Sequence, residues 1–182
     1  MILFFMRCLI CEKLSFKIIC KNCQTTLLQA SFHKREIQKG FYNYSFYALS
    51  ELEDLIKSKY YFHGDRVFEI LAKLSFEKFA KNFEFTQEVY AIPIDDHTRH
   101  EFSQTAILAH ALKSKFIRPK YHTLRANNIV KYAGKDKEFR VNNPRDFELT
   151  NLSNRMTILC DDIITTGATI IEAKKAVEKG NN

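Results

Sequence analysis

The stretch that decides the fold runs over residues 156–169 and reads MTILCDDIITTGAT. Its first five residues form a short apolar run that predicts a buried strand, and residues 169–179 carry apolar side chains at helical spacing. Two carboxylates, Asp161 and Asp162, and a Thr–Thr–Gly turn stand between them. Gly167 permits a tight turn in which consecutive backbone N–H groups converge on one anion. The stretch therefore predicts a strand, an anion-binding turn and a helix.

Each polar residue of this turn has a chemical use. The hydroxyl groups of Thr165, Thr166 and Thr169 add hydrogen-bond donors, and the amino end of the following helix favours a negative charge. The carboxylates of Asp161 and Asp162 can accept hydrogen bonds from the two hydroxyls of a ribose. A diol and a phosphate bound on one short loop indicate a ribose 5-phosphate. The alternative is an ordinary strand-to-helix turn with an acidic cap.

Helical and strand patterns extend outward from this stretch. Residues 50–59 and 65–82 carry apolar side chains at three- and four-residue spacing and predict amphipathic helices. Residues 103–115 predict a third helix with Ser103 as its N-cap. Residues 88–94 form a second short apolar run that predicts a buried strand. Buried strands that alternate with helices predict an α/β fold with a parallel sheet flanked by helices.

Four of the five cysteines lie near the amino terminus in the pattern C-x2-C-x8-C-x2-C, namely Cys8, Cys11, Cys20 and Cys23. Two such pairs complete the tetrahedral thiolate site that Zn²⁺ prefers. Two disulfide bonds are the alternative. Because four protein ligands close the coordination sphere, the zinc is expected to be structural, holding a small zinc ribbon or zinc finger over residues 1–30. Residues 31–182 are then the α/β domain. The fifth cysteine, Cys160, ends a strand and is expected to be a small buried side chain.

The composition sets broad limits on function. The chain has 182 residues, is 46% hydrophobic, and carries a net charge of +7 with a pI of about 9.1. Such a chain can bury a hydrophobic core. Its positive charge favours the binding of polyanions, either nucleic acid or a phosphate-rich small molecule. No apolar run is long enough to cross a bilayer, so we expect a cytoplasmic protein without membrane insertion.

Basic and aromatic residues alternate over residues 113–145. This mixture is typical of single-stranded nucleic acid binding, in which cations follow the phosphates and rings stack on bases. A basic loop folding over a pyrophosphate and a merely solvated basic face are the alternatives. The residues expected to contact single-stranded DNA are Lys113, Lys115, Arg118, Lys120, Arg125, Lys131 and Arg140.

Residues 161–169 resemble the phosphoribosyl pyrophosphate (PRPP) signature of the type I phosphoribosyltransferases. Together with the four-cysteine module, the chain resembles the ComF family of competence-linked, phosphoribosyltransferase-like proteins, over nearly its whole length. Residues 91–94 (AIPI) are similar to the family's aliphatic-Pro-aliphatic strand end, and Lys59 before residues 63–65 (HGD) to its lysine-containing helix end. The family's downstream Arg, Asn and aromatic residue resemble Arg140, Asn142 or Asn143, and Phe147.

The resemblance implies a role for each matching residue. Asp161 and Asp162 would hold the ribose hydroxyls of PRPP, and the 5-phosphate would be held by Thr165, Thr166, Gly167, Ala168 and Thr169. The pyrophosphate side, with Mg²⁺ bridging ligand oxygens, would be formed by Lys59, Asp95, Asp96 and Arg99. The implied function is that of an accessory protein in natural transformation, which handles incoming single-stranded DNA in the cytoplasm with other competence proteins. The alternative is an active Mg²⁺-dependent phosphoribosyltransferase acting on an unidentified acceptor.

Overall fold

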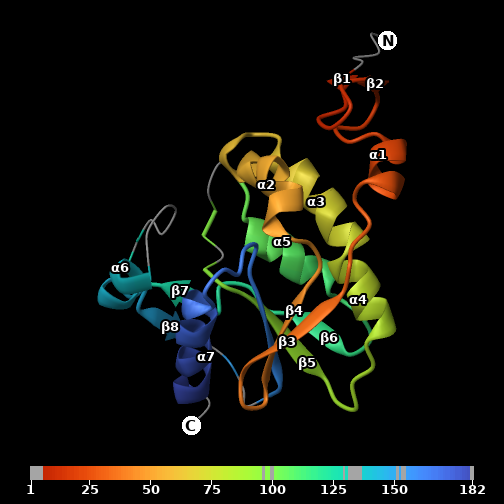
Figure 1. The fold of residues 1–182 in the computed structure, drawn as a ribbon. Coiled ribbons are helices and arrows are strands. Elements are labelled where there is room, and N and C mark those ends of the chain that lie inside the picture. Colours follow the sequence, from red (N-terminus) through yellow and green to blue (C-terminus); the bar gives the residue numbers. More distant parts are fainter. Residues whose placement is uncertain are drawn as a thin grey trace.

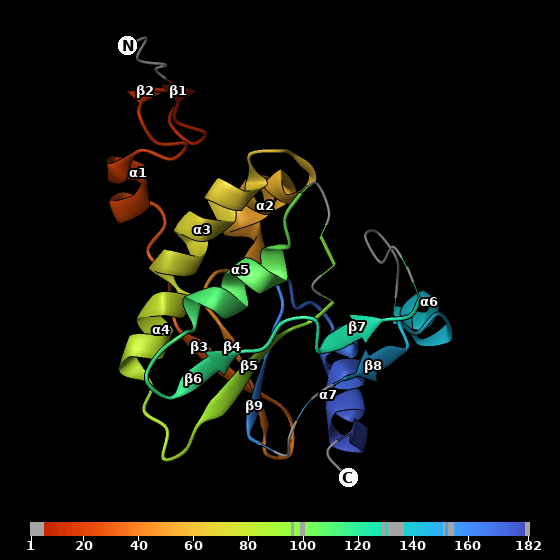
Figure 2. The ribbon, with the colours of Figure 1, turned by 180° about the vertical axis from the view of Figure 1, so that it is seen from behind.

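The structure is a computed structural model that describes residues 6–95, 97–98, 101–128, 130, 137–150, 152 and 155–180. Figures 1 and 2 show the arrangement of its helices and strands from opposite sides. The elements in chain order are β1 (Met6–Arg7), β2 (Leu14–Ser15), α1 (Lys21–Thr26), β3 (His33–Gln38), β4 (Phe41–Ser45), α2 (Leu49–Lys57), η1 (Ser58–Tyr60), α3 (Gly64–Leu74), α4 (Phe76–Asn82), β5 (Val89–Pro93), α5 (Gln104–Ala111), β6 (Ile117–Pro119), β7 (Leu124–Ala126), α6 (Lys137–Asn142), β8 (Phe147–Leu149), β9 (Thr157–Cys160) and α7 (Ala168–Gly180).

A three-stranded parallel sheet lies at the centre, with the strand order β6-β5-β9. Strand β5 is buried at every position and pairs with both neighbours, so that Ala91 lies opposite Pro119 on β6 and Ile158 on β9. Successive side chains of β5 point to opposite faces of the sheet. Ala91 packs with residues of α4 and α5, whereas Tyr90 and Ile92 pack with residues of α7. The prediction of a mixed α/β fold with a parallel sheet flanked by helices is therefore confirmed.

The helix expected over residues 65–82 is interrupted, so the prediction of one continuous helix is wrong. At Ser75 the backbone leaves helical geometry, with φ −121° and ψ −76°, and separates α3 from α4. The Ser75 hydroxyl donates a hydrogen bond of 2.6 Å to the Leu71 carbonyl oxygen. Serine competes in this way with the helical backbone for hydrogen bonds. In contrast, the predicted Ser103 N-cap is confirmed, since its hydroxyl accepts a hydrogen bond from the Ala106 N–H at 3.2 Å.

Three antiparallel pairs were not predicted, β1 with β2, β3 with β4, and β7 with β8. The β3–β4 hairpin is held by contacts on two sides. Ile37 and Phe41 join the apolar cluster around α7, while Tyr44 and Phe46 contact aromatic side chains of α4 in tilted geometry. The hairpin therefore links the sheet region to the helical layer.

The amino-terminal module lies at one end of the molecule, beyond α2 and α3 (Figure 1). Its interior is continuous with that of the larger domain. Cys8, Ile19 and Cys23 belong to the same buried cluster as Leu52 and Leu55 of α2. Among the described residues, no helix combines the length and apolar character needed to cross a membrane.

Candidate functional site

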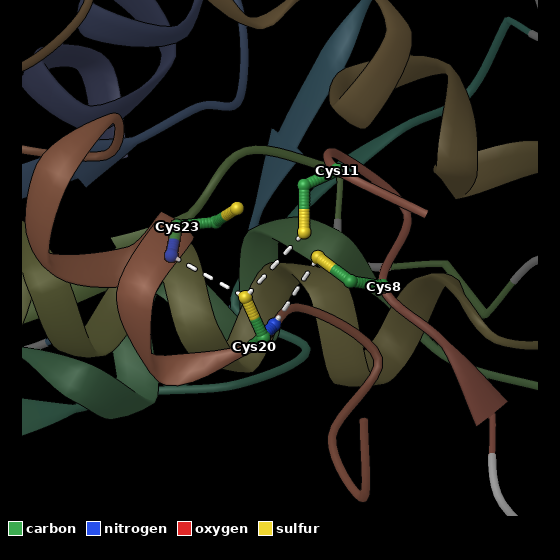
Figure 3. A group of neighbouring side chains, drawn as sticks. All are labelled: Cys8, Cys11, Cys20 and Cys23. Atoms are coloured by element: carbon green, nitrogen blue, oxygen red, sulfur yellow. Dashed lines mark hydrogen bonds between the residues drawn. The ribbon is translucent and has the colours of Figure 1, made fainter. Parts of the chain in front are cut away.

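The four amino-terminal cysteines converge, as the spacing predicted (Figure 3). Cys8 and Cys11 flank the turn after β1, whereas Cys20 caps α1 and Cys23 lies within it. All four sulfur atoms lie within 4.8 Å of one another. The Cys11 and Cys20 sulfur atoms are 3.8 Å apart. A tetrahedral zinc site with Zn–S bonds of about 2.3 Å requires an S···S separation of about 3.8 Å. The donor set therefore fits a metal such as zinc.

Backbone N–H groups already point at these sulfur atoms. Cys8 Sγ accepts hydrogen bonds from the Cys20 N–H at 3.3 Å and the Ile10 N–H at 3.5 Å. Burial alone would raise the pKa of the Cys8 thiol, but backbone hydrogen bonds, including one from Cys11, bring that pKa down to about 6. Burial raises the pKa of Cys23 to about 12. Since metal ligation requires thiolates, binding a cation here must displace protons, including the one that Cys23 holds.

A second site lies at the carboxyl ends of β5 and β9. The register pairs Pro93 with Cys160, and the Ile94 N–H donates to the Cys160 carbonyl oxygen at 2.9 Å. Asp95 and Asp161 therefore emerge side by side at one edge of the sheet. From β5 the chain passes through α5 to β6 on one side, while β9 lies on the other side of β5. Such a reversal of strand order opens a crevice in which α/β proteins bind ligands.

The two aspartates after β9 have different surroundings. Lys59, from η1, donates to Asp162 Oδ2 at 2.8 Å, and the two side chains are only 18% and 9% exposed. Burial raises the pKa of Asp161 well above its usual value, the charge of Asp162 adds to this effect, and Arg145 partly opposes it. Asp161 Oδ1 also accepts the Asp162 N–H at 2.9 Å. Two of the predicted ligand-binding residues, Lys59 and Asp162, are thus brought into direct contact.

On the β5 side, Asp95 is 7% exposed at its side chain and forms an ion pair with Arg145 at 2.9 Å. Asp95 has a left-handed backbone with φ 53°, and its carboxylate also contacts His97 and the Ala126 N–H, each at 3.5 Å. Arg145 precedes β8 and lies 50 residues along the chain from Asp95. The sequence places Arg145 at the end of the basic stretch and does not mark it as a site residue. Only its position before an aromatic residue could have drawn attention to it.

The predicted phosphate loop follows Asp162 and leads into α7. Gly167 has φ 79°, a conformation that residues with a Cβ rarely adopt. Thr165 and Thr166 are exposed, whereas Thr169 is half-buried in the first turn of α7. The Ala168 N–H donates to Thr166 Oγ1 at 3.4 Å. The loop therefore has the conformation that requires glycine and presents hydroxyl groups at its surface.

The predicted DNA-binding cations lie in several separate places. Lys113 and Lys115 are exposed between α5 and β6. Three others make local contacts: Arg118 with Glu88 at 3.1 Å, Lys120 with the Tyr90 ring, 4.8 Å from its centroid, and Arg125 with His122 Nδ1 at 2.6 Å. Asp96, Arg99 and Lys131 lie outside the described residues, as does the side chain of Arg140, which belongs to α6.

A scan of the sequence against models of known protein families finds no match, and a search of curated proteins finds none. Function must therefore be inferred from the chemistry of the two sites.

Proposed function

We propose that this protein binds PRPP together with Mg²⁺ in the crevice between the carboxyl ends of β5 and β9. The observation that carries the proposal is a convergence of groups at this edge of the sheet. The paired aspartates and the Thr–Gly loop follow β9, Asp95 follows β5, and two cations arrive from distant parts of the chain, Lys59 and Arg145.

These groups match the chemistry of the ligand. Asp161 and Asp162 would accept hydrogen bonds from the ribose hydroxyls, and residues 165–169 would surround the 5-phosphate with hydroxyl and N–H donors. Lys59 and Arg145 are each paired with a carboxylate in the structure. A polyanion can engage both cations, while the released carboxylates bind hydroxyls or Mg²⁺, which favours one or two carboxylates plus phosphate oxygens. Mg²⁺ would neutralise negative charge on the pyrophosphate group.

A role in handling single-stranded DNA during natural transformation stays a prediction from sequence. Its proposed cations are dispersed, and four of the five described side chains make contacts within the protein. The other alternative, an active phosphoribosyltransferase, requires an acceptor beside the ribose.

Calorimetric titration of the zinc-loaded protein with PRPP and Mg²⁺ tests the proposal. We expect saturable binding that is weakened at least tenfold in the Asp161→Asn/Asp162→Asn variant, because hydrogen bonds to charged groups contribute about 1.5–3 kcal/mol each. Both changes keep the side-chain shape. The matched control is Asp54→Asn, at a carboxylate that is 98% exposed on α2. Absence of PRPP binding by folded wild-type protein, or equal binding by the double variant, would contradict the proposal.

A further inference from the structure

The interior of the four-cysteine module is shared with two helices of the larger domain. Cys8 and Cys23 belong to one buried cluster with Leu52 and Leu55 of α2, and the same cluster contains Val67 of α3. Protein interiors are close-packed, so a displacement on one side of such a cluster is transmitted to the other side. The positions of α2 and α3 therefore depend on the state of the module.

A hydrogen bond adds a second link between the module and α2. The Tyr47 hydroxyl, just before α2, donates to the carbonyl oxygen of Leu28, just after α1, at 3.2 Å. Burial raises the pKa of Tyr47 to about 12, and the charge of Glu51 adds to this effect. The hydroxyl therefore keeps its proton at neutral pH and remains a donor. The segment that ends the module is tied in this way to the segment that begins α2.

Lys59 lies in η1, which directly follows α2 and is joined to α3 by a short turn. The Tyr61 N–H donates to the Ser58 carbonyl oxygen at 2.8 Å, which closes this turn. The start of α3 packs tightly against the same oxygen, since a Cβ added at Gly64 would lie only 2.3 Å from it. The backbone of η1 is therefore fixed by both helices, and a movement of α2 relative to α3 must displace Lys59.

The side chain of Lys59 reaches the crevice at the sheet edge. Its Nζ donates to Asp162 Oδ2 at 2.8 Å, and both side chains are largely buried. Charge-assisted hydrogen bonds of this kind are short, so they are sensitive to small shifts of either partner. A continuous series of contacts thus runs from the cysteines through α2 and α3 to the cation of the crevice.

We propose that the four-cysteine module regulates the crevice through the position of Lys59. When the cysteines hold a metal, α2 and α3 are fixed and Lys59 lies beside Asp162. When the metal is lost, Lys59 is displaced and the affinity of the crevice for a polyphosphate falls. Coupling between two binding sites is reciprocal, so occupation of the crevice strengthens metal retention by the same factor. The inference rests on the proposed function for its choice of ligand, whereas the displacement of Lys59 does not depend on any ligand.

Acetylation of lysines by acetic anhydride tests the displacement without a ligand. The full-length protein is labelled in its zinc-loaded form and after zinc removal by a chelator that is then dialysed away, and each lysine is quantified by mass spectrometry. We expect Lys59 to react several-fold faster in the metal-free protein, because its amine leaves a largely buried ion pair. Lys57, which is 55% exposed on α2, is the internal control and should react equally in both forms.

Two labelling results would overturn the inference. Equal labelling of Lys59 in both forms would show that the module does not position it. Faster labelling of Lys174 as well, which is 23% exposed on α7 and paired with Glu178, would show that metal loss unfolds the whole domain. The module would then be a general requirement for folding and not a control on the crevice.

Titration of the same samples with PRPP and Mg²⁺ measures the coupling. We expect metal removal to weaken binding about tenfold, within the range of 5–150-fold that is typical of coupled sites. Lys59→Met should bind more weakly and be insensitive to metal removal, whereas Lys57→Met should keep the sensitivity of the wild type. PRPP with Mg²⁺ should also slow the loss of zinc to a chelator.

The two proposals fail separately in these experiments. An equal loss of affinity on metal removal in Lys59→Met and in the wild type would overturn the route through Lys59. Absence of PRPP binding by zinc-loaded wild-type protein would remove the proposed function, while the labelling of Lys59 would still decide whether the module controls its position.

Discussion

The four-cysteine module and the crevice at the sheet edge are assembled in different ways. All four sulfur ligands come from one short segment between Cys8 and Cys23, and backbone N–H groups of that same segment point at them. In the crevice, Lys59 pairs with Asp162, which lies 103 residues later in the sequence. Arg145 pairs with Asp95, which lies 50 residues earlier. The four-cysteine cluster is therefore a product of local chain geometry, whereas the crevice depends on the tertiary packing of α2, η1 and the β7–β8 pair.

The two regions also differ in charge balance. Four cysteines carry no cation of their own, so a bound metal must supply the positive charge as the thiols lose their protons. The crevice contains its own cations, each already paired with a carboxylate. Removing the metal should therefore unfold the module, whereas removing one cation should leave the fold largely intact and expose an unbalanced carboxylate.

The largest effect is expected from Cys23→Ser. Zinc contributes about 10–16 kcal/mol to the folding of small zinc modules, more than such a module can obtain from its own core. Cys23 also shares a buried cluster with Leu52 and Leu55, so loss of the metal should loosen the packing of α2. We expect zinc content, measured by mass spectrometry of the metal, to fall from one ion per chain to a small fraction. The thermal unfolding temperature of this variant should also fall, as it should when a chelator removes zinc from the wild-type protein.

Cys160→Ala is the matched control for this experiment. Cys160 is buried at the end of β9 and does not belong to the four-cysteine cluster. Its replacement should cost stability through lost packing and leave the zinc content at one ion per chain. A full complement of zinc in Cys23→Ser, or zinc loss in Cys160→Ala, would contradict the assignment of the metal ligands.

The next largest effect is expected from Lys59→Met. This change leaves the Asp162 carboxylate, 9% exposed, without its cation and beside Asp161. Breaking a buried ion pair from one side costs about 3–5 kcal/mol, and the partial exposure of Lys59 favours the lower end of that range. Urea unfolding measures the loss. Lys57→Met, which removes an exposed cation paired with Glu53 on the same helix, should change stability by less than about 0.5 kcal/mol.

A second change distinguishes the charge effect from lost packing of the lysine side chain. Asp162→Asn in the Lys59→Met background removes the unbalanced carboxylate and should recover most of the lost stability. If the double variant is as unstable as Lys59→Met alone, the lysine acts through packing, and the ion pair does not hold η1 against the loop after β9.

A smaller loss is expected from Arg145→Met, about 2 kcal/mol. Asp95 would lose its 2.9 Å ion pair but retain its contacts with His97 and the Ala126 N–H. Replacing one partner of a partly compensated buried pair costs less than isolating a charge completely. Arg118→Met is the control, because its pair with Glu88 lies 52% and 37% exposed. Equal urea-unfolding midpoints for the two variants would show that the Asp95 pair contributes no more than a surface contact.

The difference between the two regions also explains how much the sequence predicts. The cysteine spacing predicts the metal centre because all the ligands lie close along the chain, and the apolar runs predict β5, β9 and the helices around them. The order strand–turn–helix likewise predicts a tight turn at Gly167, and this residue has a positive φ in the structure. Each of these features is determined by residues that lie close together in the sequence.

Two of the unpredicted features depend on long-range contacts, and the third depends on a local hydrogen bond. The β3–β4 hairpin carries polar residues on its exposed positions and is held by Phe79 of α4, which no local pattern reveals. The break at Ser75 follows from one side-chain hydrogen bond inside a sequence that reads as a continuous helix. Arg145 is one of many cations in its segment, and only the folded chain selects it as the partner of Asp95.

A final variant tests the charge state of Asp161 through the pH dependence of stability. Its pKa is raised in the folded protein by burial and by the charge of Asp162, so the folded state favours the protonated form. Stability from this group is complete below its unfolded pKa of about 4 and is lost as pH rises toward the folded value. Asp161→Asn removes this dependence. The stability gained by the variant over wild type should therefore grow with pH above 4, by no more than about 1.4 kcal/mol per unit. Urea unfolding at pH 4.5, 6 and 7.5 measures the trend. A gain independent of pH would show that Asp161 ionises in the folded protein as it does in the unfolded chain, and a gain that shrinks with pH would reverse the sign of its interaction with Asp162.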